Sequence, residues 1–145
     1  MAHFIFTPGI WLGEGSISFA SFDEKVAFFT RWTIQEPVPG EIEAFQEVEL
    51  SSVEQTTRNR MQISELTKGS FKVTLENDLM GKVSGKGIYD DHMVAWELRD
   101  QPGMEGYEVF KLQPDGTYQF RSEFSSPPFR TLIEGKIWKK TTAES

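Results

Sequence analysis

The chain of 145 residues contains no cysteine. It therefore has no disulfide framework, no thiolate zinc site and no cysteine nucleophile. A long apolar run is also missing: the longest dense one, Val26–Phe29, is far shorter than the ~20 residues of a transmembrane helix. The first residues have neither the basic start nor the apolar centre of a secretory signal. We therefore expect a soluble, cytoplasmic protein.

Basic residues are fewer than acidic ones. Lys and Arg number 15 against 22 Asp and Glu, which gives a net charge of −7. Nucleic-acid binding needs cations that displace counterions from phosphates, so we predict no nucleic-acid partner. Because the chain has no long apolar run, we also predict no membrane insertion. Histidine occurs only at positions 3 and 92. This is too sparse for a transition-metal site, and we predict neither a metal site nor a cofactor.

Aromatic residues, in contrast, are abundant, with 12 Phe, 4 Trp and 3 Tyr. A chain this aromatic is not a disordered tail, and one of this length can bury roughly 68–70% of its unfolded surface. We expect one domain over residues 1–145, in which these rings carry much of the stability.

Most of the sequence alternates apolar and polar residues with a period of two, which is typical of half-buried antiparallel strands. One clear example is the shared face of Val26, Phe28, Thr30, Trp32 and Ile34. Turn residues such as Gln113–Gly116 separate the segments. We count about ten candidate strands from Trp11–Phe19 onward, and only Val53–Asn59 leaves room for a helical turn.

The order of these segments predicts an up-and-down meander, since hairpins follow one another without a long crossover. Ten strands in an open sheet would leave unpaired edges, and closure removes them. We therefore predict an all-β fold, a single antiparallel up-and-down barrel of about 8–10 strands.

Three glycines share one face of the predicted strand Met80–Tyr89: Gly81, Gly85 and Gly87. Glycine weakens a strand and supplies no packing, so a local reason is expected. A sharp bend, or a bulky neighbour such as Trp96 lying across the strand, is favoured over close approach of a ligand. No Gly-Lys-Ser/Thr follows, which argues against a phosphate loop.

The segment Gly9–Gly15, Gly-Ile-Trp-Leu-Gly-Glu-Gly, resembles the opening of lipocalin-like (calycin) proteins. The resemblance implies that Trp11 plugs one barrel end and that a basic residue of the last strand lies against it. The candidates are Arg130, Lys136 and Lys139. The pattern from Gly85 to Trp96, Gly-x-Gly-x-x-Tyr-Asp followed by Trp, is also similar to uncharacterised lipocalin-like bacterial domains.

The stretch Trp11–Gly15 is also similar to the start of nitrobindin-type ten-stranded haem barrels. Those proteins hold haem iron through a histidine near the C-terminus, and the strands predicted there contain none. We expect His3 to lie in a flexible end and His92 in a solvated turn. The resemblance therefore lacks its haem ligand here.

A barrel of this size is either filled by side chains or holds one small ligand. We predict that it binds a small hydrophobic or amphipathic ligand in an apolar interior, without catalysis. The alternative is that the aromatic rings simply fill the interior. The residues predicted to line the site are Phe28, Thr30, Trp32, Gln46, Val94, Trp96, Phe120 and Ser122.

Two other functions stay open. One is an interaction module with a filled core, acting through its outer surface or as a homodimer; the acidic face of Glu41–Glu49 would suit a basic partner. The other is a small barrel enzyme of unknown reaction. Asp90–His92 holds catalytic residue types, but neighbours in a tight turn rarely converge on one substrate, so we predict no catalytic residue. Arg31 and Arg121 are expected to face outward, opposite the aromatic residues.

Overall fold

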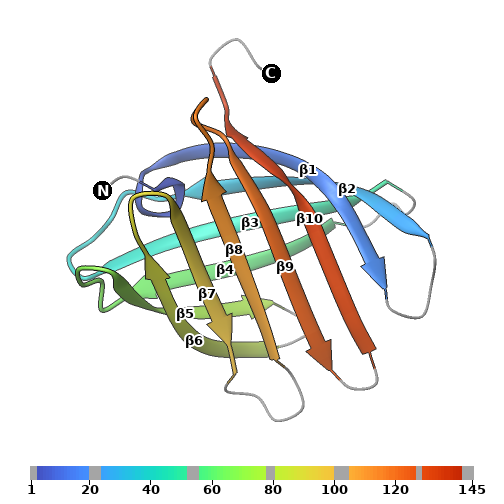
Figure 1. The fold of residues 1–145 in the computed structure, drawn as a ribbon. Helices are drawn as coiled ribbons and strands as arrows, with labels where there is room; N and C mark the ends of the chain where they lie inside the picture. Colours follow the sequence, from blue (N-terminus) through green and yellow to red (C-terminus); the bar gives the residue numbers. More distant parts are fainter. Residues whose placement is uncertain are drawn as a thin grey trace.

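The computed structural model describes residues 3–19, 24–51, 56–77, 81–99, 105–126 and 129–141. These ranges form a 3-10 turn, η1 (Phe4–Phe6), and the strands β1 (Gly9–Phe19), β2 (Lys25–Ile34), β3 (Glu41–Leu50), β4 (Thr56–Ser64), β5 (Ser70–Asn77), β6 (Gly81–Tyr89), β7 (Met93–Leu98), β8 (Glu105–Leu112), β9 (Tyr118–Ser126) and β10 (Phe129–Lys139). Each strand pairs antiparallel with the next, and β10 closes onto β1 (Figure 1). The predicted closed, all-β, up-and-down barrel is confirmed.

The period-two alternation decides which side chains face the interior. On β2, Phe28 and Trp32 are buried, whereas Phe29 on the opposite face is 57% exposed. Arg31 and Arg121 lie on the outer wall, as predicted. Of the segment with room for a helical turn, Thr56–Asn59 begin β4 and residues 53–55 lie outside the described ranges. The 3-10 turn η1 is at the N-terminus. Over the described residues, no helix is long and apolar enough to cross a bilayer.

One end of the barrel is closed by the residues of η1, and we call it the plugged end. Phe4 and Ile5 are 1% and 0% exposed. Trp11 packs against Phe4 and Tyr118, with ring centroids 5.8 and 5.6 Å apart. The plug is thus built from η1, and Trp11 contributes one wall of it.

The basic residue expected against Trp11 has only one candidate in a suitable place. Lys139 lies directly opposite Trp11 in the pairing of β1 with β10. Lys136 instead lies over the ring of Trp138, and Arg130 forms an ion pair with Glu123 on the outer wall.

The two halves of the barrel differ in how completely their inward side chains are buried. Towards the plugged end, inward residues such as Ala44, Ile63 and Val94 have almost no exposed surface. Towards the opposite end, which we call the far end, several inward residues are only partly buried: Ile17, Val48, Leu50, Asn59, Asn77, Glu108, Phe124 and Ile133. Val83 and Leu98 stay buried there, so the accessible surface lies on the other strands.

Glycines on the inward face of β6 allow close packing. A Cβ on Gly87 would lie 2.0 Å from a ring carbon of Phe71, and one on Gly85 would lie 1.6 Å from the carbonyl oxygen of Glu97. The bulky neighbour expected over these glycines is therefore Phe71, whose ring lies against Gly87. Phe71 comes from the adjacent strand β5, directly opposite Gly87 in register.

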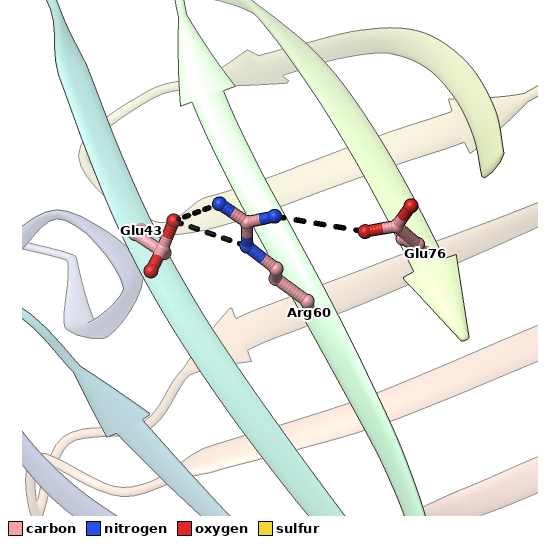
Figure 2. A network of polar contacts seen from close by, with 3 residues as sticks. All are labelled: Glu43, Arg60 and Glu76. Atoms are coloured by element: carbon pink, nitrogen blue, oxygen red, sulfur yellow. Dashed lines mark hydrogen bonds and ion pairs between the residues drawn. The ribbon is translucent and has the colours of Figure 1, made fainter. Parts of the chain in front are cut away.

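The acidic residues of β3 are matched by arginines on the strands beside it. Figure 2 shows Arg60 on β4 between Glu43 on β3 and Glu76 on β5. The Arg60 guanidinium donates two hydrogen bonds to Glu43, at 2.7 and 3.1 Å. This pairing raises the pKa of Arg60, mainly through its hydrogen bonds to Glu43. Glu47 lies opposite both Arg31 and Arg58 in register.

We expect Arg60→Met to lower the urea midpoint only slightly at low salt and not at all in ~1 M salt, since exposed ion pairs are screened. The side chain of Arg60 is 45% exposed, and methionine keeps its apolar stem. Arg99→Met, at the more exposed pair with Glu97, is the matched control. A large loss that persists in salt would show that this network supports the fold.

Candidate functional site

A layer of aromatic rings crosses the barrel between the plug and the far end; we call it the aromatic floor. Its members are Phe28, Trp32, Trp96, Phe110 and Phe120. Phe110 stacks on Trp96 and on Phe120, with centroids 5.2 Å apart in both pairs. Phe28 reaches Phe120 across the interior at 6.2 Å. Such offset and edge contacts favour a rigid base for whatever lies above it.

Glu108 of β8 points inward next to this floor. Its Oε2 accepts a hydrogen bond from Trp96 Nε1 at 2.8 Å, and its Oε1 accepts one from Ser122 Oγ at 2.9 Å. The donors lie opposite Glu108 on the two neighbouring strands, β7 and β9. The pairing register of three strands therefore builds the arrangement.

Within the described part of the chain, no cationic side chain pairs with the carboxyl group of Glu108. Among the described inward positions of the far half, Glu108 is the only acid or base. Burial raises the pKa of its carboxyl group, and the hydrogen bonds from Ser122 and Trp96 offset only part of this effect. Yet Glu108 is only partly buried by surface. The carboxyl group of Glu108 is thus desolvated, although part of the residue's surface stays exposed.

A second polar feature, the amide ladder, runs over the inner wall of β2 to β5. Asn77 Nδ2 donates to Asn59 Oδ1 at 2.9 Å, and Asn59 Nδ2 donates to Gln46 Oε1 at 3.0 Å. Gln46 Nε2 then donates to Thr30 Oγ1 at 3.1 Å, and Thr30 donates to the Glu47 carbonyl. Asn59 and Gln46 each accept from one neighbour in the ladder and donate to the other. The ladder therefore places polar atoms on the interior wall without burying a charge.

All eight residues predicted to line a site face inward, but they fall in different places. Phe28, Trp32, Trp96 and Phe120 belong to the aromatic floor, and Val94 lies buried on the plugged side. Thr30 and Gln46 belong to the amide ladder. Ser122 lies behind Glu108 as a hydrogen-bond donor and is fully buried. Their role in ligand binding stays a prediction.

The residues that sequence reasoning did not select are Glu108, Asn59 and Asn77. Glu108 shares a face with Phe110, so the alternation in β8 carried a signal that it points inward. Asn59 shares a face with Met61 and Ile63 in the same way. Alternation could thus have placed these residues inside, but not the partners that they meet.

His3 is buried in the plug and not in a flexible end, which corrects the sequence-based expectation. It is 1% exposed, and its Nε2 donates to the Asp90 carbonyl at 2.6 Å. Its Nδ1 lies 2.8 Å from the Tyr118 hydroxyl, which also accepts the Phe4 N–H. Burial raises the pKa of Tyr118. Because the Asp90 carbonyl can only accept a hydrogen bond, Nε2 of His3 carries a hydrogen.

His92 lies in an exposed turn, as expected. The Asp90 carboxylate accepts the backbone N–H groups of His92 and Met93 at 2.8 and 3.0 Å, and these hydrogen bonds lower the pKa of Asp90. Asp90 therefore shapes the turn. Both ring nitrogens of His3 are engaged, so iron binding there would require breaking the plug. In the described residues, no group of three or more metal-ligating side chains comes together.

Comparison with known proteins finds similarity in structure alone. No family model and no curated protein matches the sequence. The structure of Rv2717c from M. tuberculosis is similar with a TM-score of 0.73 at 10% identity, covering 92% of each chain. The S-type phycobiliprotein lyase CPES from Guillardia theta gives 0.73 at 8% identity, covering 94% of this chain and 89% of the lyase. At such identity the likeness shows the fold alone, a closed antiparallel barrel of ten strands.

Proposed function

We propose that this barrel binds a small amphipathic molecule in its far half and does not transform it. The observation that carries the proposal is the accessible surface of inward residues near the far end, above a floor of packed rings. Pockets of this kind combine apolar walls with a few polar groups that fix orientation. Val48, Leu50 and Phe124 supply apolar wall here, whereas Glu108 and Gln46 supply polar atoms.

Because the plug closes one end of the barrel, a ligand would approach the interior from the far end only. Phe4 and Ile5 fill the plugged end, and the aromatic floor lies next to them. A ligand would enter from the far end and place its apolar part against the floor. Its polar part would lie beside Glu108 or the amide ladder.

The alternative of an interaction module has weaker support. Glu43 is hydrogen-bonded to Arg60, and Glu47 lies opposite two arginines in register, so part of the acidic face already has basic neighbours. A barrel enzyme also has weaker support: the hydroxyl of Ser122 donates to Glu108 as a nucleophile would to a base, but Ser122 is fully buried and does not face a substrate. A single domain over residues 1–145 and a cytoplasmic location remain part of the proposal.

The test is titration with N-phenylnaphthylamine, a neutral aromatic probe that becomes fluorescent in apolar surroundings. We expect saturable binding with one site per chain. Val48→Trp should weaken it more than about tenfold, because the larger side chain fills the far half and overpacks it. Phe45→Trp, on the outer face of the same strand, should leave binding unchanged.

Both variants would first be compared by circular dichroism and thermal unfolding. Folded Val48→Trp with undiminished binding would contradict an interior site, as would a wild-type protein that never saturates.

A further inference from the structure

Among the described inward positions of the far half, Glu108 is the one that holds an acid. Trp96 Nε1 donates a hydrogen bond to Oε2, and Ser122 Oγ donates one to Oε1. A carboxylate offers about four acceptor positions. Acceptor capacity therefore remains on both oxygens, and the partial exposure of Glu108 makes it accessible from the interior.

The surroundings of Glu108 favour a cation over an anion. No Lys or Arg faces inward among the described residues of the far half. Lys111, on β8 with Glu108, and Arg121, on the neighbouring strand β9, are exposed on the outer wall. A buried carboxylate without a counter-ion is costly, and an opposite charge that also donates hydrogen bonds offsets this cost. The net charge of −7 would also attract cations to the protein.

The apolar surroundings define the rest of the ligand. The rings of Trp96, Phe110 and Phe120 form the floor beside Glu108. Val48 and Leu50 provide apolar wall on β3. A molecule that satisfies all of these groups has an apolar body and a single positively charged nitrogen.

We propose that the barrel selects amphipathic amines, with a protonated amino group hydrogen-bonded to Glu108 and the apolar body on the aromatic floor. This inference rests on the proposed function and names the ligand class of that same site. Primary amines with a pKa near ~10 are protonated at neutral pH and offer three donors. Trp96 and Ser122 act as positioning residues, because they hold the carboxylate and need not touch the amine.

The experiment uses three decyl compounds that differ only at the head group: decylamine, decanol and decanoate. Each displaces N-phenylnaphthylamine from the whole chain at neutral pH, below its micelle concentration. We expect wild type to bind decylamine about 10- to 100-fold more tightly than decanol, since hydrogen bonds to charged groups are the stronger ones. Decanoate should bind most weakly because its charge repels Glu108.

The variants test whether the preference for decylamine depends on the carboxylate of Glu108 or on the negative charge of the protein as a whole. Glu108→Gln keeps the shape and should abolish the preference for decylamine, bringing its affinity to within a factor of ~2 of that of decanol. Glu97→Gln, which removes an exposed carboxylate from neighbouring β7, should keep the preference. Equal affinity for the amine and the alcohol in wild type, or a preference that survives Glu108→Gln, overturns the inference while leaving the interior site intact. If N-phenylnaphthylamine itself does not bind, the proposed function fails and the inference with it.

Discussion

Phe4→Ala is expected to destabilise the protein by about 3–5 kcal/mol, the usual cost of truncating a buried phenylalanine. Phe4 is 1% exposed, although it lies only four residues from the start of the chain. Its ring centroid lies 4.9 Å from that of Phe110, 5.2 Å from Tyr118 and 5.7 Å from Trp32. Truncation would remove these contacts and leave a cavity at the plugged end.

Thermal unfolding and urea titration measure this loss, and the melting temperature should fall by roughly 10–15 °C for a chain of this size. Phe29→Ala is the matched control, because Phe29 is 57% exposed on the outer wall. Equal effects of the two changes would mean that the N-terminal residues add little to the stability of the barrel.

Glu108→Gln is expected to stabilise the protein at neutral pH. Burial raises the pKa of Glu108 from its ordinary value of 4.5. An acid with a raised folded-state pKa binds its proton more tightly in the folded state, so folding is favoured at low pH. The wild type therefore loses stability as the pH rises from about 4.5 through the raised value. Each unit of difference between the two pKa values is worth about 1.4 kcal/mol.

The glutamine variant lacks this titration but keeps the local hydrogen bonds. Its amide oxygen can accept from Trp96 Nε1, and its amide nitrogen can donate to Ser122 Oγ. We expect the two proteins to converge in stability below pH ~4 and to separate above it, with the variant the more stable. Urea unfolding across this pH range is the measurement.

Glu97→Gln is the control for the general effect of one carboxylate less, since Glu97 is half exposed on the outer wall. A glutamine variant that is less stable than wild type at neutral pH would refute the account, because it would mean that the two donors stabilise the charged form by more than burial disfavours it. A destabilising group inside a barrel is consistent with a binding role, where stability is given up for recognition.

The sequence predicted the barrel because the relevant signal is local. Alternation in β2 places Phe28 and Trp32 on one face, and this face is buried whichever strands lie beside it. Turn residues and the absence of a long crossover predicted the meander, and the cost of open sheet edges predicted closure. The outward direction of Arg121 followed from the same periodicity.

Other features depend on which residues meet once the strands are paired and the barrel is closed. The contact of Phe71 with Gly87 requires the register between β5 and β6, which period-two patterning leaves free to slip by two residues. His3 reaches Asp90 and Tyr118, 87 and 115 residues away, and no local pattern encodes such partners.

Glu108 combines both kinds of information. The sequence by itself determined only that Glu108 shares a face with Phe110, because Tyr107 and Val109 make the other face of β8 apolar as well. The tertiary structure decided that this face points inward, that Trp96 and Ser122 hold the carboxylate and that no cation among the described residues pairs with it. The reason is physical: periodicity fixes the face of each strand, whereas register and closure fix the neighbours that determine charge, hydrogen bonding and ligand class.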